Sequence, residues 1–485
     1  MIGQRPIVRI PEKEALMSDP TELTLSEAAA AVADRQLSPV ELTEAYLARI
    51  EKLNPELTAY VAVTAERARS DARALADEVS RGRLRGPLHG VPIGLKDLID
   101  TAGIPTAAGT AAYRGRVPDR DAAVARRLQE AGTVLLGKLA THELAYGVTT
   151  SNPKSYGTTV NPWDYQRIPG GSSGGSGAAI AARLAAATIG TDTGGSIRIP
   201  ASFCGCVGFK PTYGVVSRTG IAPLSWFLDH AGPITATVRD AALVLDAISG
   251  YDPDDEATLP GAGGVVAVAD QLDGDITGLR VGIPRTEAWA ALEPGVRSAA
   301  EAALTQVESL GMHLEEVEVP SQQALLEPIF AIVSAESRAA HSSIWPDRYD
   351  DFGADLQRLL AIPALDGDAT IVVLRAVAGY RQAMRRVFAD VDLLVSPTTP
   401  IVAPAHQAET VELAGAEVPV IMAAVVNTLP YNLAHLPAVS LPCGSADGLP
   451  VGLQLAGRPF DDARVLRAAH AYEQATDWHE HRPSR

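Results

Sequence analysis

A run of glycine and serine near the middle of the chain leads straight into a stretch of small residues. Its sequence is Pro169-Gly-Gly-Ser-Ser-Gly-Gly-Ser-Gly177, and the ten residues that follow are mostly alanine. Pro169 restricts the backbone at the start of the run, and the small residues predict a helix over Ser176–Leu184 directly after it. We therefore interpret the run as a fixed turn. The alternative is a flexible surface loop, in which the serines only contact water.

Glycine-rich turns of this kind occur in several known sites. No Lys–Ser/Thr pair follows the glycines and no G-x-G-x-x-G pattern is in register, so both nucleotide-binding fingerprints are missing. Residues Gly171–Gly175 match the G-x-S-x-G pattern of the hydrolase nucleophile elbow, with Ser173 as the nucleophile. A segment so rich in glycine and serine matches this pattern easily, so the match alone does not decide the role of Ser173.

A second glycine-rich turn occupies Gly190–Pro200, where an apolar run ends. Two glycines directly before Ser196 let the backbone turn sharply and direct consecutive N–H groups at one point. Such donors would stabilise the oxyanion that forms when Ser196 attacks a carbonyl carbon. The same pattern also fits an ordinary tight turn after a strand.

A lysine ends the apolar segment His89-Gly-Val-Pro-Ile-Gly-Leu-Lys96-Asp97. A lysine at a strand end usually extends into water. Alternatively, Lys96 points into a dry pocket while Asp97, its neighbour on a strand, faces the other way. Burial lowers the pKa of an ammonium group from about 10.4 towards neutrality, and the neutral amine can then act as a base.

The pattern of apolar residues predicts an α/β fold with a large, mixed, mostly buried β-sheet and helices on both faces. Capping boxes at Thr24–Glu27 and Ser38–Glu41 predict two amphipathic helices near the N-terminus, the second ending at Asn54-Pro55. Short apolar runs then alternate with helix-like stretches, which is typical of a sheet covered on both faces. The expected strands are Val91–Leu95, Thr133–Gly137, Ala187–Thr191, Arg280–Pro284, His313–Val319, Val391–Ser396, Ala438–Pro442 and Val451–Ala456.

We expect residues 1–485 to form a single domain. Within it, residues 1–70 would be an N-terminal helical arm, and residues 88–245 the catalytic core. Residues 321–390 are mainly helical in pattern and carry several aromatics, so we expect a variable wall on the substrate side.

The charge balance and the cysteine count exclude several functional classes. With 41 Lys+Arg against 58 Asp+Glu, the net charge of −17 disfavours nucleic acid as a partner. No apolar run reaches the roughly 18 residues of a membrane span. Three cysteines are too few for a disulfide framework and fit a cytoplasmic protein. No H-E-x-x-H occurs, and Cys204-Gly-Cys206 is too tight for a usual zinc pair, so we expect no metal and no cofactor.

Taken together, these segments resemble the amidase signature family, whose members are serine hydrolases that cleave amide bonds. The resemblance covers nearly the whole chain and is densest from His89 to Thr212. The matching motifs are Lys96-Asp97, Gly137-Lys138, Asn161-Pro-Trp-Asp164, Gly170–Gly175, Gly194-Gly-Ser-Ile-Arg198, Lys210-Pro-Thr212, Asp229–Pro233, Asn432-Leu-Ala434, Pro437-Ala438 and Gly448–Arg458.

The resemblance implies a catalytic triad. It makes Ser196 the nucleophile, Ser172 a bridging serine held by a cis peptide after Gly171, and Lys96 the base. Ser173 would then be a structural hydrogen-bonding partner. The family pattern forms the oxyanion hole from the backbone N–H groups of Thr193, Gly194 and Gly195, with Ser196 as a further donor.

The expected function is hydrolysis of a carbon–nitrogen bond in a small carboxamide, aryl amides among them, by a stand-alone enzyme. One alternative is a carbamate or ester hydrolase with the same triad. The other is the amidase-type subunit of a glutamine amidotransferase complex that acts on transfer RNA. Ile199 disfavours the amidotransferase alternative, because such subunits typically carry glutamine at this position. The net negative charge also disfavours it.

We expect side chains beside the motifs to determine substrate specificity. Tyr146, Trp226 and His435 are the candidate substrate contacts, and His435 stands where the family usually has glycine. The expected partner is a small-molecule amide, without nucleic acid or membrane, and the family leaves a homodimer open.

Overall fold

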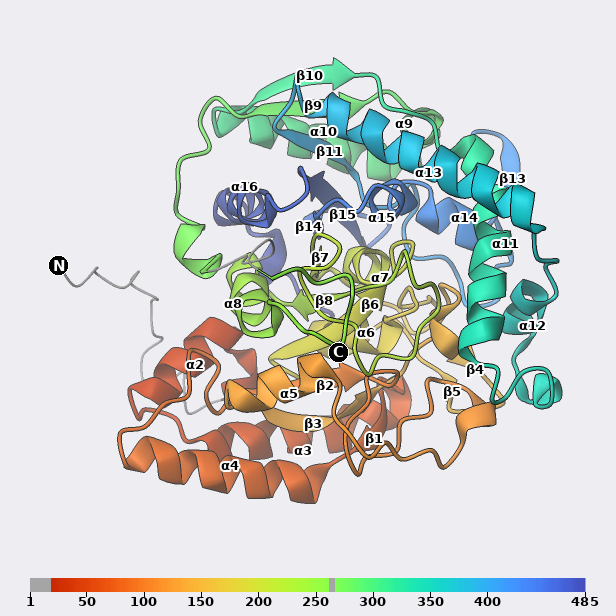
Figure 1. Cartoon of the computed structure of the whole chain (residues 1–485). Coiled ribbons are helices and arrows are strands. Elements are labelled where there is room, and N and C mark those ends of the chain that lie inside the picture. Colours follow the sequence, from red (N-terminus) through yellow and green to blue (C-terminus); the bar gives the residue numbers. More distant parts are fainter. Residues whose placement is uncertain (1–18, 261–266, 485) are drawn as a thin grey trace.

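One sheet of eleven strands organises the structure, a computed structural model that describes residues 19–260 and 267–484 (Figure 1). In spatial order the strands are β1 (Tyr60–Val63), β3 (Val134–Leu139), β2 (Pro92–Lys96), β6 (Ala187–Asp192), β8 (His230–Thr235), β7 (Val207–Lys210), β14 (Ala438–Ala446), β15 (Leu449–Ala456), β11 (Leu393–Pro397), β9 (Arg280–Pro284) and β10 (His313–Val317). Two short hairpins lie outside it: β4 (Ser151–Asn152) with β5 (Gly157–Thr158), and β12 (Thr410–Leu413) with β13 (Ala416–Pro419).

The sheet is mixed. β2 runs parallel to β3 and β6, and β9 runs parallel to β10 and β11, whereas the other neighbours are antiparallel. Leu95 of β2 pairs with Ile189 of β6. Because these two strands are parallel neighbours, their last residues, Lys96 and Asp192, come to the same edge of the sheet. This edge carries the candidate active site.

Helices cover both faces of the sheet, so every residue of β2, β3, β6, β7, β8, β11 and β15 is buried. The helices are α2 (Leu25–Ala33), α3 (Pro39–Leu57), α4 (Ala65–Ser80), α5 (Ala123–Glu130), α6 (Gly174–Ala181), α7 (Arg198–Cys204), α8 (Val238–Ile248), α9 (Glu287–Ala290), α10 (Pro294–Ser309), α11 (Gln323–Ala340), α12 (Ala354–Leu360), α13 (Gly367–Val387), α14 (Val420–Val425), α15 (Leu429–Leu433) and α16 (Asp462–Gln474). The predicted α/β fold with a large mixed sheet is confirmed.

The N-terminal region differs in part from the helical arm that the sequence predicts. Both capping boxes are present, at the starts of α2 and α3. α3 continues through Pro55 to Leu57 instead of ending at Asn54. Residues 60–63 form strand β1, which pairs with β3 at the edge of the main sheet, and residues 1–18 lie outside the described residues.

The glycine–serine run is a buried turn that passes directly into α6. The helix begins at Gly174, two residues earlier than predicted, because glycine allows close packing there. A Cβ on Gly174 would lie 2.3 Å from Oγ1 of Thr150, and one on Gly175 would lie 2.5 Å from the backbone nitrogen of Ala140. The fixed turn is therefore confirmed, and a flexible surface loop is excluded.

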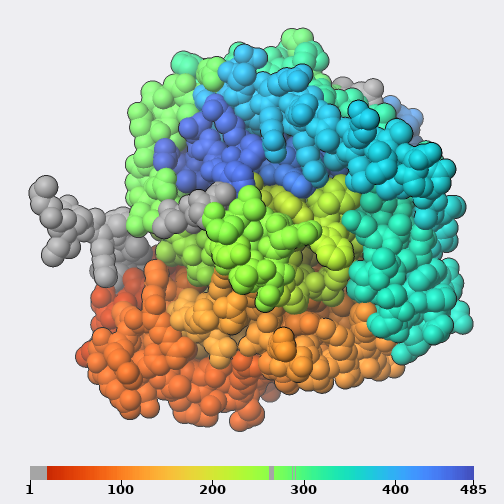
Figure 2. Space-filling model, viewed as in Figure 1, coloured from red at the N-terminus to blue at the C-terminus, as the bar shows by residue number. Residues whose placement is uncertain are grey.

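The remaining segments pack around the sheet. Residues coloured green, from about 210 to 260, lie between the N-terminal and C-terminal parts of the chain on the face in Figure 2. α11, α12 and α13 stand together at one side of the sheet (Figure 1). In the two described stretches, no helix is long and apolar enough to cross a membrane.

Candidate active site

Lys96 ends β2 inside the protein, without contact with solvent. Its Nζ donates hydrogen bonds to Ser172 Oγ at 2.7 Å and to Thr191 Oγ1 at 2.8 Å. Burial lowers the pKa of Lys96 to about 7, although the negative charges of Asp229 and Asp192 oppose this shift. A substantial fraction of Lys96 is therefore a neutral amine at neutral pH, as a general base requires.

Ser172 and Ser173 lie next to each other in the turn before α6, yet their hydroxyls have different surroundings. The peptide bond between Gly171 and Ser172 is cis, as the family resemblance implies, and Ser172 Oγ accepts the hydrogen bond from Lys96. Ser173 Oγ donates to the carbonyl of Thr191 at 3.1 Å and accepts from its N–H at 3.2 Å. The hydroxyl of Ser173 thus joins the turn to β6, which argues against the nucleophile elbow.

Ser196 lies in the turn between β6 and α7 and is 8% exposed, at the wall of a cavity. Its carbonyl accepts a hydrogen bond of 3.2 Å from the N–H of Ser173, so the two glycine-rich turns are in direct contact. Among the described residues, no hydrogen bond reaches Oγ of Ser196 or joins it to Ser172. The hydroxyl of Ser196 is therefore free to meet a substrate in the cavity.

An ion pair that sequence reasoning missed supports the turn around Ser196. Asp192 and Arg198 are fully buried and their side chains lie 2.9 Å apart. The Asp192 carboxylate also accepts the N–H groups of Gly195 at 2.8 Å and Ile197 at 3.1 Å. Burial disfavours the charge of Asp192, but Arg198 and further hydrogen bonds outweigh it and hold the pKa well below the usual range. The segment Gly190–Pro200 contains both residues, but the sequence alone does not show that they pair.

Some backbone N–H groups around Ser196 are hydrogen-bonded within the described residues, and others are not. The N–H of Gly195 bonds to Asp192, so our assignment of Gly195 to the oxyanion hole is corrected: this donor supports the turn. The N–H groups of Thr193, Gly194 and Ser196 have no acceptor within the described parts of the chain. Thr193 and Gly194 also line the cavity beside Ser196, where an oxyanion would form.

Asp229 begins the matching motif Asp229–Pro233, but sequence reasoning assigned it no role. It lies after a loop that approaches the Ser196 turn, and its Oδ1 accepts a hydrogen bond of 2.5 Å from Thr193 Oγ1. Its Oδ2 accepts the N–H groups of Leu224 at 2.8 Å and Ser225 at 3.1 Å. Burial raises the pKa of Asp229. The carboxylate therefore connects the loop at 224–229 to the first residue of the proposed oxyanion hole.

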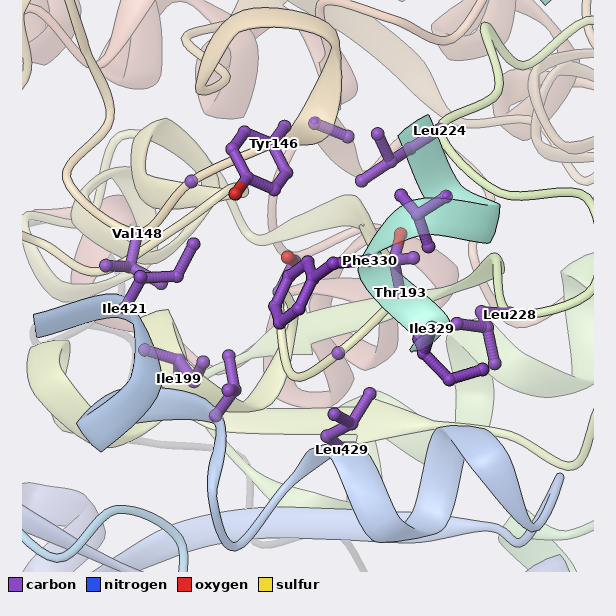
Figure 3. A pocket seen from close by; sticks show the side chains of 16 residues that line it. Tyr146, Val148, Thr193, Ile199, Leu224, Leu228, Ile329, Phe330, Ile421 and Leu429 are labelled. Carbon is purple, nitrogen blue, oxygen red and sulfur yellow. The ribbon is translucent and has the colours of Figure 1, made fainter. Parts of the chain in front are cut away.

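The cavity at Ser196 is small, with a volume of about 60 Å³, and mostly apolar. Tyr146, Val148 and Ile199 line one side, and Phe330 of α11 stands in the middle of the view in Figure 3. The other lining residues are Ala145, Gly147, Thr193, Gly194, Leu224, Leu228, Ile329, Val333, Ile421, Val425 and Leu429. Residues of the 321–390 region thus line this cavity, as does Tyr146, and their contact with a substrate stays a prediction.

Trp226 and His435, the other predicted substrate contacts, do not line this cavity. The side chain of Trp226 points outward and is 61% exposed. His435 stacks on Tyr213 with ring centroids 3.9 Å apart, and its Nε2 lies 2.8 Å from the carbonyl oxygen of Phe227. His435 also has a left-handed backbone with φ of 60°, a conformation that glycine adopts without strain, which explains the glycine that the family usually carries there.

A larger cavity, with several charged side chains in its wall, adjoins the apolar one. It has a volume of about 800 Å³, and Tyr146, Gly147, Val148 and Ile421 line both. Asp355 stands in its wall, ion-paired with Arg358 and with its Oδ2 3.3 Å from Nε2 of His142. An amide bound at Ser196 can therefore extend charged groups from the apolar cavity towards the charged side chains of the larger one.

The described residues contain no group of three or more His, Cys, Asp or Glu side chains arranged to hold a metal ion. Cys204 and Cys206 are buried and free, and burial raises the pKa of both thiols above the usual value.

Comparison with known proteins shows the family of the chain. The family profile described as amidase matches residues 41–466. The chain belongs to the amidase family. Its members with known structure share the fold: the peptide amidase from Stenotrophomonas maltophilia superposes with a TM-score of 0.85 and 33% identity, covering 96% of this amidase and 98% of that chain. The chain is thus an enzyme that acts on amide C–N bonds.

The relatives in sequence carry a more specific name. They are the A subunits of glutamyl-tRNA(Gln) amidotransferase. The one from Chloroflexus aggregans is 44% identical over 95% of this amidase and 98% of its own length. The protein of the same name from Moorella thermoacetica is 41% identical, over 95% and 98%.

These relatives overturn two of our expectations. A stand-alone hydrolase of small carboxamides is contradicted, as is a partner set limited to a small-molecule amide without nucleic acid, because proteins so similar over their full length are named as subunits of a transfer-RNA amidotransferase. The physical reason is that the motifs encode attack on an amide carbon, which both functions need. Ile199 and the acidic charge were weaker guides than the similarity of the whole chain.

Proposed function

We propose that this amidase is the amide-cleaving subunit of a transfer-RNA-dependent glutamine amidotransferase. It would hydrolyse the side-chain amide of glutamine at Ser196 and release ammonia for transfer to glutamyl-tRNA on a partner. The observation that carries this proposal is the 44% identity, over 95% of the chain, to the amidotransferase relative from Chloroflexus aggregans. The hydrogen bond of 2.7 Å between Lys96 and Ser172 supports the chemistry.

The proposed reaction proceeds through an acyl-enzyme. Neutral Lys96 accepts the proton of Ser172, Ser172 accepts the proton of Ser196, and Oγ of Ser196 attacks the amide carbon. The N–H groups of Thr193 and Gly194 stabilise the oxyanion. The proton then returns through Ser172 to the departing nitrogen, ammonia leaves, and water hydrolyses the ester of Ser196 by the same steps in reverse roles.

The two adjoining cavities suit the two ends of glutamine. The cavity at Ser196 is lined by apolar side chains such as Val148 and Ile199, which would contact the two methylene groups of the glutamine side chain. The α-ammonium and α-carboxylate groups would extend past Tyr146 into the larger cavity, where Asp355 and Arg358 supply both signs of charge. Charged groups need such partners when they leave water.

The partner, rather than this chain, would hold the transfer RNA. The net charge of −17 disfavours contact with a phosphate backbone, so a complementary protein has to supply the basic surface. A cytoplasmic location agrees with this role and with the three buried, free cysteines of the described residues.

Ammonia release from glutamine tests the proposal. We would compare the purified chain alone with the chain added to the remaining subunits of a bacterial amidotransferase and glutamyl-tRNA, with Ser196→Ala as the control. We expect ammonia release from the wild type that rises when the partners and transfer RNA are added, and none from Ser196→Ala. Cleavage of simple anilides or carbamates without any release from glutamine, under both conditions, would overturn the proposal.

A further inference from the structure

Helix α11 and the loop at residues 224–229 meet at the wall of the apolar cavity. Ile329 and Val333 of α11 line the cavity, and Glu336 follows on the same face of the helix, one turn further on. Leu224 and Leu228 of the loop lie next to α11 in the close view (Figure 3). The cavity wall is thus made jointly by a helix and a loop that are far apart in sequence.

Two polar contacts fasten this loop to the helix. Oγ of Ser225 donates a hydrogen bond of 2.5 Å to Oε2 of Glu336. Just past the end of the helix, Nε2 of His341 lies 2.8 Å from the carbonyl oxygen of Pro223, while its Nδ1 lies 3.0 Å from the hydroxyl of Tyr113. The geometry fits a neutral His341 that donates from Nε2 and accepts at Nδ1.

From Ser225, hydrogen bonds continue to the turn at residues 193–196. The N–H of Ser225 bonds to Oδ2 of Asp229, and Oδ1 of Asp229 accepts the hydroxyl of Thr193. The carbonyl of Ser225 also accepts the N–H of Asp229 at 3.0 Å. Glu336, Ser225, Asp229 and Thr193 therefore form one unbroken series of hydrogen bonds from α11 to the residues beside Ser196.

We propose that Glu336 is a positioning residue for the reaction at Ser196, acting through Ser225 and Asp229 on the oxyanion donors of the 193–196 turn. This inference rests on the proposed catalytic role of Ser196 but not on the identity of the substrate. Without the carboxyl of Glu336, the hydroxyl of Ser225 loses its partner, and of the two polar contacts only that of His341 with Pro223 still holds the loop to the helix. The loop at 224–229 is then held less firmly against the cavity. Asp229 then holds Thr193 less firmly, and the oxyanion donors lose their alignment.

The charge state of Glu336 makes the contact dependent on pH. Burial raises the pKa of Glu336 to about 7, and the nearby charge of Asp229 adds to this shift, while hydrogen bonds from Ser225 and from the N–H of Trp226, and the charge of Arg218, oppose it. Arg338, on the same helix, bonds instead to the carbonyls of Leu360 and Ile362. An ionised carboxylate is a stronger acceptor than a protonated one, so the contact with Ser225 strengthens as the pH rises through 7.

A fluorophosphonate probe measures the reactivity of Ser196 without any assumption about the substrate. Oγ of Ser196 attacks phosphorus, the P–O bond forms, fluoride leaves, and the proton passes through Ser172 to Lys96. We expect Glu336→Ala to slow labelling about tenfold, and Ser225→Ala to slow it less, because Glu336 then keeps its hydrogen bond from the N–H of Trp226. The double variant is expected to be no slower than Glu336→Ala, because both lack the contact between Ser225 and Glu336. Glu327→Gln, an exposed change on the same helix, is the control that leaves the rate unchanged.

The pH profile separates positioning from general destabilisation. In the wild type, Lys96 has to lose its proton, and ionisation of Glu336 strengthens the contact with Ser225, so below pH 7 the logarithm of the labelling rate is expected to rise more steeply than the ionisation of Lys96 alone allows. Glu336→Gln still accepts from Ser225 but does not titrate, so its slope is that of Lys96 alone and does not exceed about 1, and its rate at pH 9 is expected to be about threefold below the wild type.

Each outcome decides the inference. A labelling rate in Glu336→Ala equal to the wild type, additive effects in the double variant, or an unchanged slope in Glu336→Gln would overturn it. If Glu336→Ala fails to fold, the slope of Glu336→Gln decides alone. A wild type that is labelled normally but releases no ammonia from glutamine with its partners would count against the proposed function only.

Discussion

Asp192 and Arg198 form a fully buried ion pair on which the nucleophile turn rests. Beyond the contact of 2.9 Å between them, Arg198 donates to the carbonyl of Thr428 at 2.9 Å and to Gln454 Oε1 at 2.8 Å. Thr428 in turn donates to the carbonyl of Gly194 at 2.6 Å. The pair thus connects the turn at 193–196 to the C-terminal part of the sheet, and the backbone of the proposed oxyanion hole is held from both sides.

Removing Arg198 is expected to destabilise the protein strongly. Arg198→Met leaves the Asp192 carboxylate buried without its counter-ion, which costs about 3–5 kcal/mol of unfolding free energy in comparable pairs. Arg126→Met breaks an exposed ion pair with Glu130 and is expected to cost at most about 1 kcal/mol. Urea denaturation of both variants measures the difference. Equal losses would show that the buried pair has no special role.

The two neighbouring serines provide a sharp test of the nucleophile. We expect Ser196→Ala to abolish turnover, because Ser196 is the proposed nucleophile and the hydroxyl of Thr193, which also lines the apolar cavity, already donates to Asp229. Ser173→Ala leaves the N–H and carbonyl of Thr191 without their partner, so we expect a loss of about 1–3 kcal/mol in stability with most of the activity retained. Steady-state rates and thermal melts of both variants check this. An inactive Ser173→Ala with an active Ser196→Ala would restore the nucleophile elbow.

The sequence predicts the architecture of the catalytic edge well because local rules control it. Glycines in tight turns, capping boxes and apolar runs depend on neighbouring residues, so α2, α3, β2 and β6 appear close to their predicted bounds. The contact between Lys96 and Ser172 could be predicted only from the family resemblance, because 76 residues separate the two in sequence. Asp229 and Glu336 could not be found in this way, because their partners are set by the packing of distant loops and helices.

Substrate contacts were the least predictable part of the site. Trp226 and His435 stand beside motif residues in sequence, yet the turn of the backbone directs the first to solvent and stacks the second on Tyr213. Adjacency in sequence does not determine side-chain direction in a loop. The substrate class could not be predicted either. The motifs indicate attack at the acyl carbon, but they do not indicate which molecule accepts the released nitrogen.

The pKa of Lys96 predicts how activity depends on pH. The base has to be neutral in the free enzyme, and its pKa is about 7. We therefore expect kcat/KM to rise as the pH passes through about 7 and to level off on the alkaline side. A buffer series from pH 5 to 10, with glutamine as substrate, measures this. Activity that stays constant down to pH 5 would exclude lysine as the base.

The same shift predicts an effect on stability. The folded pKa of Lys96 lies below its unfolded value, so between pH 7 and about 10.4 the unfolded chain binds more protons, and stability rises with pH. Lys96→Met removes this dependence. Its gain in unfolding free energy over the wild type is expected to be larger at pH 7 than at pH 10, by on the order of 3 kcal/mol. Urea denaturation at both pH values measures the gain, and equal gains would contradict a buried, neutral lysine.

The two glycines before Ser196 should respond very differently to the same substitution. Gly195 has a φ of 135°, and a Cβ there would lie 2.2 Å from Thr428 Oγ1 and 2.7 Å from Ile199 Cδ1. At Gly194 the nearest atom to a Cβ, in Leu429, is 3.6 Å away. Gly195→Ala therefore has to displace Thr428 or the turn, whereas Gly194→Ala keeps the backbone N–H and meets only ordinary van der Waals contacts.

We expect Gly195→Ala to lower kcat at least about 100-fold, comparable to the loss of one oxyanion donor, because the turn no longer directs its N–H groups at the acyl oxygen. Gly194→Ala is the matched control and is expected to stay within about tenfold of the wild type. Adding Thr428→Ser to Gly195→Ala serves as a further control. It removes the methyl group of Thr428 but keeps the hydroxyl that meets the new Cβ, so it does not relieve the clash. If Gly194→Ala proved as inactive as Gly195→Ala, the turn geometry would not be what separates these two positions.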